Sequence, residues 1–192
     1  MGKKVLVVVA HPDDETIWMG GALLSNYKKW GISIISLCRK NDNDRAPKFR
    51  NVCRALNAQS FMSDLEDERL NKIPVGDVVK RIKKYAGKDY YYVFTHGKNG
   101  EYGHIRHKDV HKAVNYMIKK KMISCREVIY FAYQKKGKYA YPKKKSDKFI
   151  YISKDLLEKK KMLIRNVYGF AKNSFEDICC RGAESFSIKR VK

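Results

Sequence analysis

The sequence predicts an α/β fold: a Rossmann-like three-layer sandwich with a mostly parallel sheet. Short runs of β-branched and aromatic residues alternate along the chain with segments of helical periodicity, which is typical of strand–helix–strand units. The first run, at 5–10, is apolar throughout, as expected of a strand buried on both faces. Since domains commonly contain about 100–200 residues, the 192-residue chain is expected to form one domain over 1–192.

Each expected element follows from a local pattern. Apolar runs predict the strands, which are 5–10, 32–38, 90–95, 127–133 and a short edge strand at 150–152. Apolar residues at helical spacing predict the helices, which are 14–30, 46–56, 78–85, 108–121 and 153–168. Gly31 and Gly169 are expected to end the first and the last helix. The lysine-rich segment 135–148 is expected to be a mobile, solvated surface loop.

The charge balance is strongly basic. The chain has 42 Lys and Arg residues against 20 Asp and Glu residues, so its formal net charge is +22. Such a surface attracts phosphates, anionic lipid or nucleic acid without selecting one of them. Two interpretations stay open. The surplus is a solvated lysine-rich surface, or it draws an anionic substrate or membrane surface to runs such as 143–145 and 159–161.

The cysteines and the apolar runs bear on location. The five cysteines are odd in number and include no C-x-x-C pair, which favours free thiols in a reducing compartment over a disulfide framework. No apolar run approaches the ~18 residues of a transmembrane helix, and the apolar start lacks the length and cleavage site of a signal peptide. We therefore expect a cytoplasmic protein whose contact with membranes is at most peripheral.

An unusual group of polar residues follows the first strand and opens the first helix. Ala10-His11-Pro12-Asp13-Asp14-Glu15 places one imidazole and three carboxylates within five positions. The helix dipole alone explains acidic residues in a first turn, but it does not explain His11 at the end of a buried strand. Because ligands of open parallel sheets bind beyond the carboxyl ends of the strands, we interpret this motif as part of a site.

A second polar segment, 95–107, follows the third strand. Its glycines at 97, 100 and 103 allow the backbone to turn tightly and to approach a ligand. His104 and His107 are three residues apart, a spacing that suits one face of a turn entering a helix. His96 is interpreted as a hydrogen-bonded structural residue, and His111 as a surface or supporting residue.

Together the two motifs offer neutral imidazoles and a carboxylate, which are donor types that zinc accepts. Two histidines and one aspartate leave a coordination position for water, as in catalytic rather than structural zinc sites. We expect one Zn²⁺ per chain, and Fe²⁺ could occupy the same ligands. A phosphoesterase usually needs two carboxylate-bridged metals, so two ions per chain would favour that activity instead.

The same motifs resemble those of a known family. Ala-His-Pro-Asp-Asp-Glu and Gly-Glu-Tyr-Gly-His-x-x-His are similar to signatures of the LmbE/PIG-L zinc-dependent N-deacetylases, which act mainly on N-acetylglucosamine-containing small molecules and glycolipids. Looser similarity continues at 45–57, 67–70, 161–168 and 184–186. The resemblance implies a metal-dependent hydrolase that removes an acetyl group from an N-acetylated amino sugar or its glycolipid, nucleotide or glycan conjugate.

The resemblance also implies roles for individual residues. His11, Asp14 and His107 match the zinc ligands, and Asp13 matches the base that takes a proton from the attacking water. His104 matches a second catalytic group, which stabilises the oxyanion or protonates the leaving amine. The positions that match substrate-binding residues are Arg45, Asp67 and Tyr102.

Several positions depart from the family pattern. Lys48 stands where glutamate is usual and Asn57 where glycine is usual. Ile105-Arg106 replaces the common Pro-Asp between the two histidines, which leaves open what orients those histidines. The alternative function is a basic nucleic-acid- or polyanion-binding protein with a vestigial metal site. Such a module should interleave aromatic or glycine-rich readout motifs with basic residues, and without them nucleic acid is not an expected partner.

Overall fold

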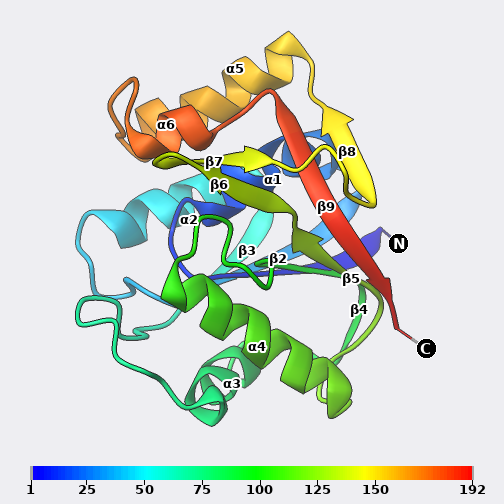
Figure 1. Ribbon diagram of the computed structural model, residues 1–192. Helices are drawn as coiled ribbons and strands as arrows, with labels where there is room; N and C mark the ends of the chain where they lie inside the picture. Colours follow the sequence, from blue (N-terminus) through cyan, green and yellow to red (C-terminus); the bar gives the residue numbers. More distant parts are fainter. Residues whose placement is uncertain (1, 192) are drawn as a thin grey trace.

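The computed structural model describes residues 2–191 and alternates strands with helices through most of its length (Figure 1). The strands are β1 (Lys3–Val9), β2 (Trp30–Ser36), β3 (Ala58–Met62), β4 (Asp89–Thr95), β5 (Ser124–Phe131), β6 (Tyr133–Lys136), β7 (Tyr139–Pro142), β8 (Lys148–Tyr151) and β9 (Ala183–Arg190). The helices are α1 (Asp14–Asn26), α2 (Arg45–Ala55), α3 (Val75–Lys83), α4 (Ile105–Lys119), α5 (Lys154–Met162), the π-helical turn η1 (Leu163–Val167) and α6 (Phe175–Cys179). Within residues 2–191, no helix is both long enough and apolar enough to span a membrane.

Seven strands form one sheet in the order β3-β2-β1-β4-β5-β9-β8. The first five of these are mutually parallel, and β9 runs antiparallel to both of its neighbours. β6 and β7 form a separate antiparallel hairpin. The predicted α/β class with a mostly parallel sheet is confirmed.

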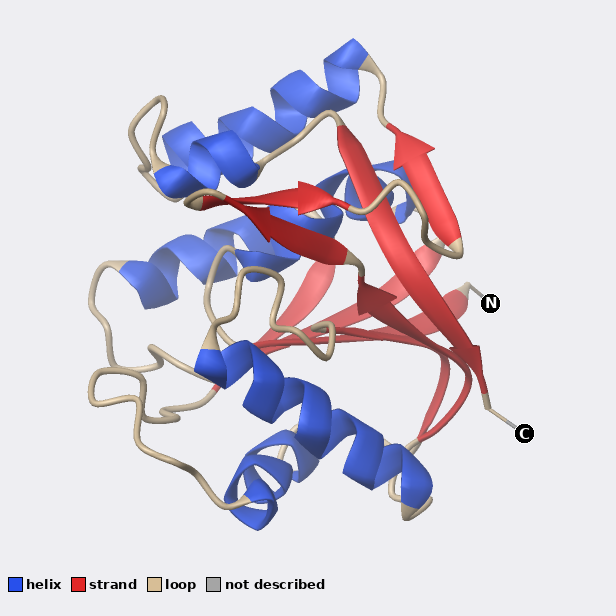
Figure 2. Cartoon of the chain, in the orientation of Figure 1, coloured by secondary structure: helices blue, strands red, loops and turns tan. Residues whose placement is uncertain are grey.

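Helices cover both faces of this sheet (Figure 2). On one face, Val5, Val7 and Val9 of β1 belong to a core shared with α1, α2 and η1. On the other face, Leu6 and Val8 belong to a core shared with α3 and α4. Burial of alternate side chains on opposite faces explains the unbroken apolar run at 5–10 and produces the three predicted layers.

Some element bounds differ from those predicted. α1 ends at Asn26, and Gly31 lies inside β2, because the chain from Trp30 onward pairs with β1. The expected helix 153–168 begins as predicted, with the Ser153 hydroxyl accepting the N–H of Leu156, but it divides into α5 and η1. β3 and β9 lie outside the predicted strands, since their mixed polar and apolar residues form no continuous apolar run.

The segment 135–148 is not the expected surface loop. Most of it belongs to the β6–β7 hairpin and to the start of β8. The hairpin turns at Gly137, whose φ is +59°, and its inner side buries Tyr133 and Ala140. The Ala140 N–H donates to Cys179 Sγ at 3.3 Å. Lysines at the exposed positions of the hairpin separate its apolar residues along the chain, so the sequence shows no apolar run there.

A buried ion pair joins α5 to β9. Lys160 Nζ donates to Glu184 Oε1 at 2.7 Å, and both side chains are fully buried. Lys160 is therefore not available to attract an anion, so the interpretation of the run 159–161 as a surface patch is wrong at its central residue. The neighbouring Lys161 Nζ lies 3.4 Å from Asp177 Oδ1.

The same carboxylate holds the kinked part of α1. Met19 has a non-helical φ of −145°, and beyond this kink the N–H groups of Gly21 and Ala22 donate to Glu184 at 2.7 and 2.9 Å. A Cβ at position 21 would lie 2.5 Å from Ile152 Cγ2. Glycine at this position therefore lets α1 pack closely against β9 and against Ile152, which precedes α5.

Candidate metal centre and catalytic site

Both predicted motifs lie beyond the carboxyl ends of β1 and β4, which are neighbours in the sheet. From β1 the chain adds β2 and β3 on one side, and it then returns to add β4 and β5 on the other. Open α/β sheets bind their ligands in the crevice that such a reversal creates. The strand order therefore brings residues 10–15 and 95–107 together.

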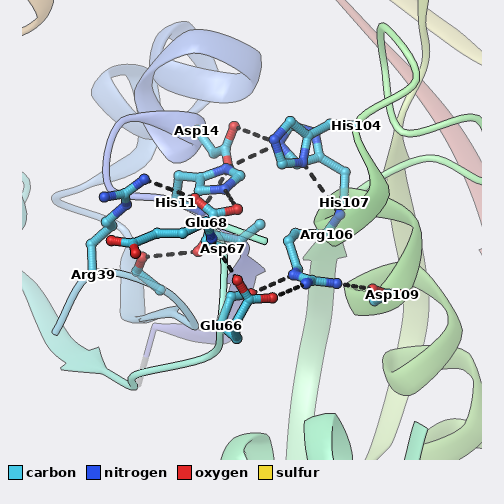
Figure 3. Close-up of polar contacts among 12 residues, drawn as sticks. His11, Asp14, Arg39, Glu66, Asp67, Glu68, His104, Arg106, His107 and Asp109 are labelled. Carbon is cyan, nitrogen blue, oxygen red and sulfur yellow. Dashed lines mark hydrogen bonds and ion pairs between the residues drawn. The ribbon is translucent and has the colours of Figure 1, made fainter. Parts of the chain in front are cut away.

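His11, Asp14 and His107 converge on one point (Figure 3). His11 Nδ1 lies 3.2 Å from Asp14 Oδ2 and 3.2 Å from His107 Nε2, and His107 Nε2 lies 3.4 Å from Asp14 Oδ1. Ligand atoms held about 2.0–2.1 Å from a tetrahedral ion lie about 3.3–3.4 Å from one another. These three side chains therefore have the donor types and the spacing of a site for one tetrahedral ion.

Other donors stand close by. The described residues form three overlapping groups whose donor atoms lie within 4.8 Å of one another, which are His11 with His104 and His107, Asp14 with His96 and His107, and His11 with Cys38 and Asp67. Hydrogen bonds already use some of these atoms. The N–H of Ala10 donates to His96 Nε2 at 2.9 Å, and Asp67 Oδ1 lies 3.0 Å from His11 Nε2. The predicted ligand set and His104 supply further donor atoms that face one another, and of these Asp14 Oδ1 also accepts the Nε1–H of Trp18 at 2.7 Å.

Carboxylates hold the outer nitrogens of both candidate imidazole ligands. Glu101 Oε2 accepts from His107 Nδ1 at 2.6 Å, as Asp67 Oδ1 does from His11 Nε2. These contacts assign the tautomers that turn His107 Nε2 and His11 Nδ1 toward Asp14. Burial would raise the pKa of Asp14, but the facing histidines lower it well below its usual range. Asp14 is therefore an anionic donor between two oriented rings.

Glu101 is the residue to which sequence reasoning gave no role. It is fully buried, and besides His107 it binds His96 Nδ1 at 2.8 Å and the N–H of Gly97 at 2.8 Å. Although burial favours its neutral form, the charge and hydrogen bonds of the two histidines lower its pKa to about 2. His96 is hydrogen-bonded, as interpreted, but it also stacks on His107 with ring centroids 3.9 Å apart. In the sequence, the signal for this role of Glu101 is an acidic residue between His96 and His104 in a loop rich in glycine.

Asp13 stands next to the candidate ligands in a strained backbone conformation. Its φ is +112°, a value that residues other than glycine rarely adopt, and such strain gathers at functional sites. Arg45 Nη1 lies 3.7 Å from Asp13 Oδ2. Burial, followed by the charge of Asp14, raises the pKa of Asp13 well above its usual range. A carboxylate with a raised pKa is suited to accept a proton near neutral pH.

His104 lies at the beginning of α4, with its ring centroid 4.7 Å from that of His11 and 4.8 Å from that of His107. Its Nδ1 accepts the N–H of Arg106 at 3.2 Å. Burial, followed by the neighbouring histidines, lowers the pKa of His104 to about 4. The ring is then neutral at pH 7, and its proton is on Nε2, where it can donate to a ligand.

Two cavities open onto these residues. The larger, of about 320 Å³, includes the predicted substrate-binding residues Arg45 and Asp67. The smaller, of about 180 Å³, includes Tyr102, the third predicted residue, together with His104 and Phe175. The structure thus brings the predicted site residues together around these two cavities, except that His107 is fully buried behind them and lines neither. Asp67, however, directs its two oxygens to the candidate ligand His11 and to Arg39 Nη2.

The sequence of the chain places it in a family. Residues 6–118 match the PIG-L family, described as GlcNAc-PI de-N-acetylase, and this match includes both motifs. The chain therefore belongs to the PIG-L family. A curated relative, Uncharacterized protein L374 of Acanthamoeba polyphaga mimivirus, is 30% identical in an alignment over 125 residues that covers 56% of this chain. The match spans about half of that relative, 54% of its length.

Three solved structures share the fold. The conserved protein TT1542 from Thermus thermophilus has a TM-score of 0.69 and 14% identity, covering 96% of this chain and 94% of that one. N,N'-diacetylchitobiose deacetylase from Pyrococcus horikoshii has a TM-score of 0.70 and 17% identity, covering 98% and 84%. GalB, the 4-carboxy-2-hydroxymuconate hydratase from Pseudomonas putida, has a TM-score of 0.62 and 16% identity, covering 99% and 98%. At these identities the likeness concerns the fold, and the fold hosts more than one chemistry.

Proposed function

We propose that residues 1–192 form a single zinc-dependent N-deacetylase domain that removes the acetyl group from an N-acetylated amino sugar of the N-acetylglucosamine type, or from its conjugate. One observation carries the proposal. Two imidazole nitrogens and a carboxylate lie 3.2–3.4 Å apart beside Asp13 and His104, in a chain of the PIG-L family. Amide hydrolysis needs an activated water, a base and an oxyanion donor, and these residues have the chemistry for all three.

His11, Asp14 and His107 would hold one Zn²⁺ or Fe²⁺ ion. When bound, such an ion supplies Lewis acidity, which polarises the acetyl carbonyl and makes water easier to deprotonate. The protein's contribution is the orientation of the donors. Glu101 and Asp67 hold the outer ring nitrogens of the two histidines, and support of this kind is worth about 10–100-fold in metal affinity.

Asp13 acts as the base in this proposal. Its carboxylate takes a proton from the attacking water, and the raised pKa of Asp13 favours this transfer. The Arg45 guanidinium, whose Nη1 lies 3.7 Å from Asp13 Oδ2, balances part of the carboxylate's charge. When the tetrahedral intermediate collapses, Asp13 returns the proton to the departing nitrogen, so the products are acetate and a free amine.

His104 stabilises the charge that develops on the acetyl oxygen. Its Nε2–H is free to donate because Nδ1 is used by the Arg106 N–H. A donor that is oriented before the reaction lowers the barrier more than one that must reorient during it. Tyr102 packs against Phe175, with ring centroids 4.8 Å apart, and forms a wall against which the sugar would lie.

We further propose that the substrate is an anionic conjugate. A hollow of about 670 Å³ is lined by five cationic side chains and by aromatic rings, without an acidic residue among the described residues that line it. The cationic residues are Lys136, Lys143, Lys144, Lys145 and Arg181. On the adjoining β7, Tyr139 stacks on Phe175 at 6.2 Å, so aromatic side chains connect the catalytic crevice with this hairpin.

Acetate release tests the proposed function. The panel contains N-acetylglucosamine, its uridine diphosphate conjugate, an N-acetylglucosaminyl phospholipid and a chitin oligomer, each with metal-free and zinc-loaded protein. We expect zinc-dependent release, faster with the anionic conjugates, and slower release from those conjugates when Lys143, Lys144 and Lys145 are replaced by glutamine. Salt-dependent binding of nucleic acid or another polyanion by a protein that binds no zinc would support the alternative function instead.

We also propose a reducing, cytoplasmic location. All five cysteines are buried free thiols, which is the state that such a compartment maintains. Quantitative thiol labelling of the denatured protein, isolated under alkylating conditions from its source cells, would return five thiols.

A further inference from the structure

Arg106 is a fully buried arginine between the candidate catalytic His104 and the candidate ligand His107. It stands at one of the two positions where this chain replaces the family's Pro-Asp. Its side chain leaves α4 and reaches the loop that joins β3 to α3, at 63–74 (Figure 3). A buried guanidinium is stable only when its donors are satisfied, so its partners identify what it holds.

The guanidinium of Arg106 contacts this loop at two residues, Glu66 and Asn71. Its Nε donates to the carbonyl of Glu66, Nη2 contacts Glu66 Oε2 at 2.5 Å, and Nη1 donates to the carbonyl of Asn71 at 2.9 Å. Nη1 also contacts Asp109 Oδ2 at 2.9 Å, which ties the group back to α4. Glu66 Oε1 in turn accepts the backbone N–H of Glu68 at 2.7 Å, so the loop is folded around the residue that Arg106 holds.

The residue after Glu66 is Asp67, and its carboxylate faces the metal centre. Asp67 Oδ1 lies 3.0 Å from His11 Nε2, and Oδ2 accepts from Arg39 Nη2 at 3.2 Å. The contact with His11 fixes the ring so that Nδ1 points toward Asp14 and His107. A shift of the loop by about 1 Å away from His11 would break this contact, because N–H···O hydrogen bonds span only about 2.7–3.2 Å.

We propose that Arg106 is a positioning residue, which holds the loop 63–74 through Glu66 and Asn71 so that Asp67 keeps His11 oriented as a metal ligand. The first turn of α4 then supports both sides of the centre, because it supplies His107 directly and orients His11 through Arg106. The part concerning the metal rests on the proposed function, whereas the part concerning the loop does not.

The loop part is tested on metal-free protein. Hydrogen exchange of amides 64–72 is compared among the wild type, Arg106→Met and Val114→Ala. Val114 is fully buried on the same helix, about two turns beyond Arg106, and makes no hydrogen bond through its side chain, so its truncation matches a general loss of stability. We expect at least tenfold faster exchange of this loop in Arg106→Met and wild-type exchange of the loop in Val114→Ala. Equal exchange in all three proteins would overturn the proposal.

The metal part is tested by zinc affinity, measured in competition with a chelator. Arg106→Met and Asp67→Asn should each weaken zinc binding by about 10–100-fold. If Arg106 acts through Asp67, the double variant should bind zinc no more weakly than Asp67→Asn alone. If the fold-losses of zinc affinity in the two single variants multiplied in the double variant, Arg106 would not act through Asp67. Glu66→Ala removes the loop carboxylate that contacts Arg106 Nη2 but leaves the buried arginine in place. This variant should also weaken zinc binding.

The two tests separate the proposals. A wild-type protein that binds no zinc refutes the proposed function, while the exchange measurement still decides whether Arg106 holds the loop. A wild type that binds zinc, with unchanged affinity in Arg106→Met, refutes the positioning role alone. Arg106→Lys keeps the charge without the forked geometry, and we expect zinc affinity between those of the wild type and Arg106→Met.

Discussion

Two buried groups of ionisable residues differ in one respect that matters for function. In the pair of Lys160 and Glu184, each charge faces its partner, and the remaining oxygen contacts of Glu184 go to the N–H groups of Gly21 and Ala22. At the centre around His11, outer nitrogens are held by carboxylates, but the inner donor atoms face one another at 3.2–3.4 Å. The two charges of the pair are matched within it, whereas the centre has convergent donors in the form of a cation site.

This difference shows what identifies a site. Burial of charge alone does not, because Lys160 and Glu184 are buried as completely as His107 and Glu101. The distinguishing features are convergent donors, a cavity beside them and a strained residue, Asp13, at its edge. We therefore expect changes at the centre to affect turnover and metal binding, and changes at the pair to affect the free energy of unfolding.

The largest effect is expected at Asp13. Asp13→Asn removes the proposed base but leaves the three donors in place, so acetate release should fall about 10²–10⁴-fold. Zinc content and melting temperature should stay close to those of the wild type. Turnover at the wild-type rate would show that another group takes the proton from water.

The next effect is expected at the closed pair. Glu184→Ala leaves the Lys160 ammonium buried without a partner, and such uncompensated charges cost about 3–5 kcal/mol. The measurement is the free energy of unfolding in urea, together with zinc affinity. We expect the stability to fall while the affinity per folded molecule is unchanged.

A matched double variant sharpens this prediction. Lys160→Met combined with Glu184→Gln removes both charges but keeps an oxygen for the N–H groups of Gly21 and Ala22. It should recover most of the stability lost in Glu184→Ala, since replacing a buried ion pair is often nearly neutral. If the double variant is as unstable as Glu184→Ala, the loss of stability does not come from the unpaired charge of Lys160.

The smallest of these effects is expected in α1. Gly21→Ala would place a Cβ 2.5 Å from Ile152 Cγ2 and 3.2 Å from Glu184 Oε1. Relief of such overpacking typically costs about 1–3 kcal/mol. Thermal unfolding should report this loss, and Gly31→Ala is the control because a Cβ there has open space. Equal melting temperatures of the two variants would contradict the packing described for the kinked helix.

Sequence patterns predicted the parallel core of the fold better than its C-terminal part. β1 and β4 are continuous apolar runs, because both faces of the central strands are buried. The β6–β7 hairpin and β9 carry lysines on exposed positions, so their apolar sides are interrupted in the sequence. Only strand pairing reveals them, which is between β6 and β7 in the hairpin and with β5 and β8 for β9. The Lys160–Glu184 pair could not be predicted, since it joins residues 24 positions apart across two elements.

At the site, the motifs identified the residues that meet but not all of their relations. His11, Asp14 and His107 could be selected because polar residues directly after buried strands are unusual. The role of Glu101 depends on the positive φ values of the loop from Gly100 to Gly103, which turn its carboxylate inward. The role of Arg106 depends on a loop 40 residues away along the chain. Neither relation is visible in a local pattern.

The most direct test of the central claim is the zinc content of the protein. Metal-free wild type and His107→Ala are loaded with Zn²⁺, freed of excess ion and measured by elemental analysis, with folding checked by circular dichroism. We predict one ion per wild-type chain and binding at least 100-fold weaker in folded His107→Ala. No ion or two ions in the wild type, or equal binding by the variant, would contradict the assignment of His11, Asp14 and His107 as one metal centre.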